Sequence, residues 1–157
     1  MPKRPPEEYL GVYKTLRDVP TVRRFDVMNP ASFPHENPWD AHWDDWPHSK
    51  SESTEQKNAR AKREWTNFMD EQGRHYALAD PEHVETWARS LLLNGGRGRE
   101  DGRKPIVVYR FYLRPVASFY DWLMYHTEYR HAYNPVYMAA SIPGSSARIP
   151  FEAYLDK

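Results

Sequence analysis

The sequence predicts an all-α fold, in which a bundle of four to five helices follows an irregular N-terminal arm rich in proline and aromatic residues. Three observations predict it. Apolar residues recur at helical spacing in three stretches after residue 51, helix-start and helix-stop residues bound these stretches, and eight prolines interrupt residues 1–50. Six Trp, eleven Tyr and six Phe provide large buried area, so a core can form although only 39% of the residues are hydrophobic.

The arm is expected to span residues 1–50. Its prolines disfavour regular structure, but apolar residues share one face of a possible short helix at 8–17. Four large aromatic residues follow, and we expect them to pack against the helical domain, with disorder as the alternative: Phe33, Trp39, Trp43 and Trp46. The helical domain is expected at 51–141. Residues 142–157 contain Gly144-Ser145-Ser146 and Pro150, and are expected to form a linker or tail.

The first helix is predicted between a capping box formed by Ser53 and Gln56 and a C-terminal glycine, Gly73. One of its faces is apolar and is expected to be buried: Ala61, Trp65, Phe68, Met69 and Gln72. The opposite face carries Arg60, Arg63 and Asn67.

The second helix is predicted to begin at Asp80-Pro81, a favourable N-cap followed by proline at the first helical position, and to end at Gly95-Gly96. The third is predicted to begin at Pro105 and to extend to His126, with a kink or a late start at Pro115. A β-strand over residues 106–113 is the competing interpretation, because this stretch is rich in β-branched and aromatic residues. Asn134-Pro135 predicts a further short helix.

Composition excludes several classes of function. Without cysteine the chain has no disulfide and no thiolate chemistry, and its 22 basic and 22 acidic residues cancel. Basic residues nevertheless outnumber acidic ones by four in residues 57–114. The sequence shows no signal peptide and no apolar run long enough for a membrane span, so we expect a cytoplasmic protein that does not contact a membrane.

Candidate metal and catalytic residues do not form a recognisable motif. Histidines and aspartates gather in the arm, but their spacing matches no known metal site, and we expect no metal: His35, His42 and His48 with Asp40, Asp44 and Asp45. Tyr133 stands near Arg130 and His131, but a nucleophile needs partners that converge from separate elements. We therefore expect no catalytic site, no cofactor and no small-molecule substrate.

An ordered set of motifs resembles a known family. A helix with Trp65 and Phe68 precedes the sequence Asp80-Pro81-Glu82-His83-Val84, a glycine-rich turn follows, and a long helix then carries Phe119-Tyr120-Asp121-Trp122-Leu123 before Tyr133-Asn134-Pro135-Val136. Over residues 52–141 this order is similar to the SAM-like core-binding domain of tyrosine recombinases and phage integrases.

The resemblance implies a SAM-like helical bundle that clamps one face of double-stranded DNA and positions a separate catalytic domain. That domain would carry the Arg, His and Tyr of strand cleavage, so no catalytic residue of the family can be assigned to this chain. The implied partners are duplex DNA and either further copies of the chain or a catalytic recombinase. The alternatives are a helical protein-interaction or regulatory module without direct DNA binding, and a small helix-turn-helix regulator, for which the loop at 95–104 is too long.

Helical phase suggests which side chains would contact DNA. Arg103, Arg110 and Arg114 lie within about 40° of one another at 100° per residue, opposite the apolar face of the third helix. Glycine in the preceding loop would allow close approach to the backbone of DNA. The candidate contacts are Arg60, Arg63, Asn67, Arg97, Arg99, Arg103, Lys104, Arg110 and Arg114. The alternative for all of them is an ordinary solvated helix face.

Overall fold

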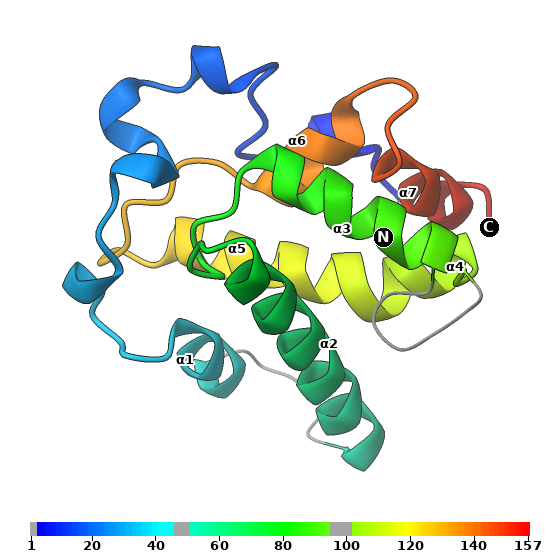
Figure 1. Cartoon of the computed structure of the whole chain (residues 1–157), viewed down its shortest axis with the longest axis horizontal. Coiled ribbons are helices and arrows are strands. Elements are labelled where there is room, and N and C mark those ends of the chain that lie inside the picture. The colour runs from blue at the N-terminus through cyan, green and yellow to red at the C-terminus, as the bar shows by residue number, and fades with distance from the viewer. Residues whose placement is uncertain (1–2, 46–50, 95–101) are drawn as a thin grey trace.

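The computed structural model describes residues 3–45, 51–94 and 102–157 (Figure 1). Within these ranges the chain forms α-helices, short 3-10 turns and one π-helical turn and contains no β-strand, which confirms the all-α prediction. The α-helices are α1 (Pro38–Asp45), α2 (Glu52–Glu71), α3 (Pro81–Asn94), α4 (Pro105–Val108), α5 (Arg114–Tyr125), α6 (Pro135–Ser141) and α7 (Arg148–Leu155). Helix α5 packs against α1, α2 and α6, and runs through the middle of Figure 1.

Helix α2 begins two residues earlier than predicted. Its N-cap is Ser51, whose hydroxyl accepts a hydrogen bond from the backbone N–H of Thr54 at 3.2 Å, so the predicted capping box at Ser53 is wrong. Gly73 follows the end of the helix with a φ of 71°, in the left-handed region that a C-terminal glycine adopts readily. The remaining helix starts at Pro81, Pro105 and Pro135 are confirmed.

The third predicted helix is continuous from Pro105 to Tyr125 but is not uniform. Its middle section, Tyr109–Leu113, is a π-helical turn, in which the N–H of Arg114 donates to the carbonyl of Tyr109 five residues back. Pro115 lies two residues after this turn, where its missing N–H would otherwise interrupt the α-helical pattern. The chain therefore accommodates Pro115 with a wider turn, and the alternative of a β-strand over 106–113 is wrong.

The N-terminal segment packs on the helices through its aromatic residues. Phe25 is fully buried and stacks on Tyr133 at 3.9 Å between ring centroids, and its backbone N–H donates to the hydroxyl of Tyr133 at 2.9 Å. The possible helix at 8–17 does not form, and 3-10 turns lie at Pro6–Glu8 and Leu16–Asp18. Gly11 between them has a φ of 76°, a backbone conformation that interrupts a right-handed helix.

Residues 142–157 differ from the expected linker, because they contain α7 and add to the core. Phe151 is buried, and Tyr154 stacks on Tyr109 at 4.3 Å between ring centroids. The turn that leads into α7 is fixed by α3, because the carboxylate of Glu85 accepts hydrogen bonds from the N–H groups of Ser146 and Ala147 at 2.9 and 2.8 Å. The first N–H of the helix, that of Arg148, donates to the hydroxyl of Ser145 at 3.2 Å. This helix start was missed because Gly144-Ser145-Ser146 and Pro150 were assigned to a linker, although Ser145 provides a local hydrogen-bond acceptor.

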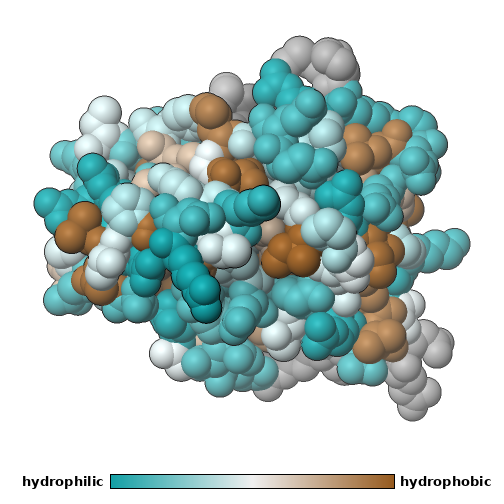
Figure 2. All heavy atoms as spheres, turned by 90° about the horizontal axis from the view of Figure 1, so that it is seen from above, coloured by the Kyte–Doolittle hydropathy of each residue, from teal (hydrophilic) through white to brown (hydrophobic). Residues whose placement is uncertain are grey.

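The surface shown in Figure 2 is mixed, with hydrophobic residues in several separate places among hydrophilic ones. Large exposed apolar side chains include Val22 and Val27 in the N-terminal segment. Within the described ranges, no helix combines the length and the apolar character that crossing a membrane requires.

Candidate nucleic-acid interface

Four basic side chains gather where α2 packs against the π-helical turn and the start of α5. Lys57 and Arg60 come from α2, Arg110 comes from the π-helical turn, and Arg114 is the first residue of α5. The aromatic ring of Phe111 joins the two elements, because the ammonium of Lys57 lies 5.3 Å and the guanidinium of Arg60 lies 5.7 Å from its centroid. We call Lys57, Arg60, Arg110 and Arg114 the basic cluster.

Three members of the basic cluster border a groove between α1, α2 and α5. The groove has a volume of about 460 Å³. It is lined by Trp39, His42, Trp43, Thr54, Lys57, Asn58, Arg110, Arg114, Pro115 and Ser118. No aspartate or glutamate is among these residues, so all of its permanently charged groups are cations. A concave, positive surface of this kind attracts anionic ligands and raises their local concentration.

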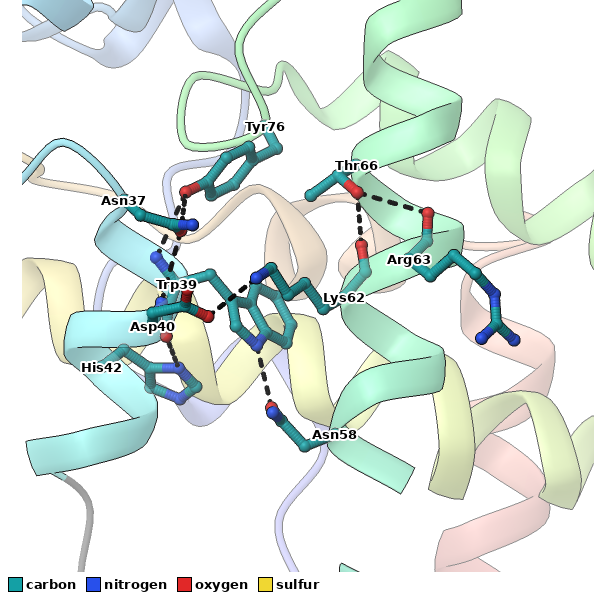
Figure 3. A network of polar contacts seen from close by, with 9 residues as sticks. All are labelled: Asn37, Trp39, Asp40, His42, Asn58, Lys62, Arg63, Thr66 and Tyr76. Carbon is teal, nitrogen blue, oxygen red and sulfur yellow. Dashed lines mark hydrogen bonds and ion pairs between the residues drawn. The ribbon is translucent and has the colours of Figure 1, made fainter. Parts of the chain in front are cut away.

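The α1 wall of the groove is fixed by polar contacts with α2 (Figure 3). The buried indole of Trp39 donates from Nε1 to Oδ1 of Asn58 at 2.8 Å. Near it, the ammonium of Lys62 pairs with the carboxylate of Asp40 at 2.8 Å. These two contacts connect α1 to consecutive turns of α2, so the groove has a defined width.

Tyr76 fixes the beginning of α1. Its hydroxyl donates to Oδ1 of Asn37 at 2.8 Å and accepts from the backbone N–H of Trp39 at 3.2 Å (Figure 3). Burial raises the pKa of Tyr76 to about 12, so the hydroxyl keeps its proton at neutral pH and can donate. The residues that hold α1 in place are thus neutral or internally paired, and they leave the charge of the groove unchanged.

The basic cluster is not neutralised by the described acidic residues. Neighbouring cations of α2 do form ion pairs, Lys62 with Asp40 at 2.8 Å and Arg63 with Glu64 at 4.0 Å. Within residues 3–45, 51–94 and 102–157, no ion pair involves a member of the basic cluster. Arg60, Arg110 and Arg114 are exposed, so their guanidinium groups are available to an external anion.

The structure brings together three of the predicted contact residues, Arg60, Arg110 and Arg114. Arg63 is exposed on α2 but is engaged with Glu64. Asn67 lies in a different groove, between α2 and α3, whose lining includes the acidic Glu64 and Glu71.

The two predicted contacts that directly precede the third helix differ from expectation. Because this helix begins at Pro105, Arg103 lies outside it and does not share a helical face with Arg110 and Arg114. Its guanidinium instead lies 4.9 Å from the centroid of the buried Tyr112 ring. Lys104 is exposed at the N-cap of α4. The candidates Arg97 and Arg99 lie outside the described residues.

Sequence reasoning missed Lys57 and Trp43. Lys57 stands three positions before Arg60, so extending the basic face of the first helix by one turn would have found it. Trp43 was assigned to an irregular arm, although it lies on α1. The available signal was Asn37-Pro38, which has the same cap-and-proline form as Asn134-Pro135.

The histidines and aspartates of the arm come together only in part. His35, Asp44 and Asp45 line one pocket, whereas His42 is buried against Phe119. His48 lies outside the described residues. Among the residues that are described, no group of three or more histidine and acidic side chains is arranged to hold a metal ion.

His131 and Tyr133 both pack on the ring of Phe25, at 4.6 and 3.9 Å between ring centroids. Both are buried, and Nε2 of His131 and the hydroxyl of Tyr133 bond to backbone groups of Ala77 and Phe25, whereas Arg130 is exposed.

Comparisons with protein-family models, with curated proteins and with solved structures gave no match.

Proposed function

We propose that this chain is the DNA-binding module of a site-specific recombinase or integrase system, and that the basic cluster contacts the phosphates of duplex DNA. The observation that carries the proposal is the groove itself: three cations and no acid line it, and its cations come from elements that pack directly on each other. Lys and Arg bind phosphates at any base sequence, which supplies affinity and orients the protein on the duplex.

The resemblance to SAM-like core-binding domains supports the recombinase part of the proposal. The motifs behind it occupy structurally coherent places, because Phe119, Trp122 and Leu123 are buried on α5 and Asn134-Pro135 opens α6. In this proposal the chain is non-catalytic and acts in the cytoplasm, where it positions a catalytic recombinase domain on duplex DNA. A second copy of the chain, or the catalytic domain, would bind the second half of the DNA target site.

The test measures binding of the chain to a labelled DNA duplex by fluorescence anisotropy at a series of salt concentrations. Contact of four cations with phosphates predicts a slope of log affinity against log salt of about −3 to −4. The double variant Arg110→Gln/Arg114→Gln removes two of these contacts, so its slope should be less steep by about 2.

A matched control removes the same charge elsewhere. Arg17 and Arg23 are exposed in the N-terminal segment, and Arg17→Gln/Arg23→Gln should leave both affinity and slope unchanged. Thermal unfolding of all three proteins tests whether the variants remain folded. Equal losses of DNA affinity in the two double variants would show that binding depends on net charge and not on the basic cluster. Absence of binding at about 50 mM salt would contradict the proposal.

A protein-interaction module is the second candidate, and one observation favours it. Val22 and Val27 are 74% and 56% exposed, and they border a groove of about 410 Å³ with Met28 and Phe33. Large exposed apolar side chains around a groove are typical of protein-binding surfaces. If the chain fails to bind DNA, this groove becomes the site to examine, by substitution of Val22 and Val27.

A further inference from the structure

The groove beside Val22 and Val27 lies between the N-terminal segment and the connection from α5 to α6. Its volume is about 410 Å³, and it shares no lining residue with the groove beside the basic cluster. The two walls are in contact, because Phe33 packs on Tyr129 at 5.3 Å between ring centroids, and the two segments lie side by side in Figure 1. Binding of DNA phosphates by the basic cluster therefore leaves this surface without a role.

One wall of the groove is apolar and projects into solvent. Val22 and Val27 are 74% and 56% exposed, and the partly buried side chains of Met28 and Phe33 line the groove beside them. A single exposed valine is ordinary on a protein surface, but two valines on an apolar groove form a surface whose burial is favourable. A partner that covers it gains about 25 cal/mol for each Å² of apolar surface removed from water.

The opposite wall carries one acid and one base, two positions apart. Glu128 and Arg130 both line the groove and are exposed, whereas Tyr129 between them is buried. Within residues 3–45, 51–94 and 102–157, neither Glu128 nor Arg130 takes part in an ion pair. The groove thus presents a carboxylate and a guanidinium that are both available to charges on a partner.

This arrangement of charges is complementary to itself. A two-fold axis brings the same patch of two copies together in reversed orientation, so that Glu128 of one copy can face Arg130 of the other, and the reverse. A partner whose charges all have one sign would satisfy only one of these two groups. The whole chain adds no barrier to such contact, because its 22 basic and 22 acidic residues cancel and two copies do not repel each other.

We propose that this groove joins two copies of the chain about a two-fold axis, with Glu128 of each copy paired with Arg130 of the other. Val22 and Val27 are then buried between the copies. The association needs no DNA, so the inference goes beyond the proposed function, and in the proposed recombinase system it supplies the second copy for the second half of the target site. A contact made by one groove is small for a protein interface, and we expect a Kd on the order of 100 µM.

The experiment is sedimentation equilibrium of the full chain without DNA. The concentration is varied from about 5 µM to about 500 µM, a range that includes the expected Kd. The average mass should rise with concentration from that of one chain toward that of two. At the lowest concentration almost every molecule is a monomer, so thermal unfolding there compares the folding of the variants without any contribution from association.

Charge reversals test whether the association uses the groove. Glu128→Arg places like charges opposite one another and so does Arg130→Glu, so each variant alone should associate about tenfold more weakly than wild type. An equimolar mixture of these two variants should recover the wild-type affinity, because each supplies the charges that the other lacks. The control Glu8→Arg makes the same change of charge at an exposed residue outside the groove and should have no effect.

The apolar wall is tested by the double variant Val22→Ser/Val27→Ser. It removes apolar surface from the contact without adding a charge, so association should weaken by about tenfold or more. Both valines are exposed in the single chain, and the variant should therefore remain folded.

The outcomes keep this proposal separate from DNA binding. A chain that stays monomeric up to about 500 µM would overturn the association through this groove, whatever its affinity for DNA. Unchanged association in either charge reversal or in the folded valine variant would also overturn it, because the contact would lie elsewhere. A mixture of the two reversals that does not associate would overturn the two-fold pairing of Glu128 with Arg130. A chain that forms dimers but does not bind DNA would support the association and contradict only the proposed function.

Discussion

His131 is a titratable residue whose two ring nitrogens have different surroundings. The side chain is 5% exposed, Nε2 donates to the carbonyl of Ala77 at 2.7 Å, and Nδ1 is buried without a hydrogen-bond partner. Burial lowers the pKa of His131 to about 4, because the charged imidazolium would lose its hydration. The native protein therefore holds a neutral histidine at pH values where the unfolded chain binds a proton.

We expect the free energy of unfolding to fall as pH decreases from about 6.5 to about 4 on account of this residue. The folded pKa lies below the unfolded value of 6.5, so protonation favours the unfolded state in this window. The full effect is about 3 kcal/mol, from about 1.4 kcal/mol per pKa unit. The measurement is urea denaturation of wild type and His131→Gln between pH 4 and 7.5. Glutamine can keep the donor toward Ala77 but does not titrate.

The difference in the free energy of unfolding between wild type and His131→Gln reports the titration of His131 alone. Burial raises the pKa of Asp121 to about 6, and its titration changes stability in the opposite direction over the same window. That contribution is present in both proteins and cancels in the difference. Parallel stability curves for wild type and His131→Gln would show that His131 does not titrate as its burial requires.

At the scale of elements, the dipeptide Asn-Pro stands at the start of three helical elements. Asn29-Pro30 opens a 3-10 turn, Asn37-Pro38 precedes α1, and Asn134-Pro135 opens α6. Asn134 is fully buried and has the largest set of contacts. Its side chain accepts from the N–H of Val136 and donates to the carbonyl of Ala117 and to the carboxylate of Asp121. It therefore joins α6 to α5 as well as capping α6.

We expect Asn134→Ala to lower the free energy of unfolding by about 3 kcal/mol. The substitution removes a helix cap, worth about 1 kcal/mol, and leaves buried acceptors on Ala117 and Asp121 without their donor. Asn29→Ala is the matched control, because Asn29 caps an exposed turn through the N–H of Ala31. Its cost should be at most about 1 kcal/mol. Chemical denaturation measures both, and equal costs would contradict the role assigned to the α5 contacts.

The elements that could be predicted from sequence are those whose boundaries are encoded locally. Helices α3 and α6 begin at a proline that follows a capping residue, and both starts were predicted. Helix α7 was not, because Gly144-Ser145-Ser146 and Pro150 indicate a linker, whereas the turn before the helix is fixed by Glu85 of α3. The π-helical turn was not predicted either, since Pro115 indicates that the helical pattern changes but not how. For the candidate site, helical phase predicted the positions of Arg60, Arg110 and Arg114. It could not predict that Trp43 lines the same groove, because that position depends on how α1 packs against α2 and α5.

At the scale of the whole molecule, one hydrophobic core draws on the N-terminal segment, the central helices and α7. Phe25, Tyr120, Tyr133 and Phe151 all belong to it. Phe25 stacks on Tyr133 at 3.9 Å and on Tyr120 at 5.9 Å between centroids, although more than ninety residues separate them in sequence. Such long-range contacts predict that the segment before α1 and the helices unfold together.

We expect Phe25→Ala to destabilise the entire molecule by about 3–5 kcal/mol, the range for removing a buried phenylalanine. Circular dichroism should show a lower melting temperature for the helices, in a single transition. Val22→Ala, at a side chain that is 74% exposed, should change stability by less than about 0.5 kcal/mol. An unchanged helical melting temperature in Phe25→Ala would mean that the N-terminal segment detaches independently.

The π-helical turn has a consequence for how this sequence can diverge. A π turn contains one more residue than an α turn, so Tyr109–Leu113 is equivalent to a one-residue insertion in a helix. A deletion there would restore regular α-helix, but it would also rotate the preceding residues by about 100° relative to α5. Arg110 would leave its place beside Arg114, and α4 would lose its alignment with α7. Related sequences that keep this surface should therefore conserve the length of the turn as well as the cation at position 110.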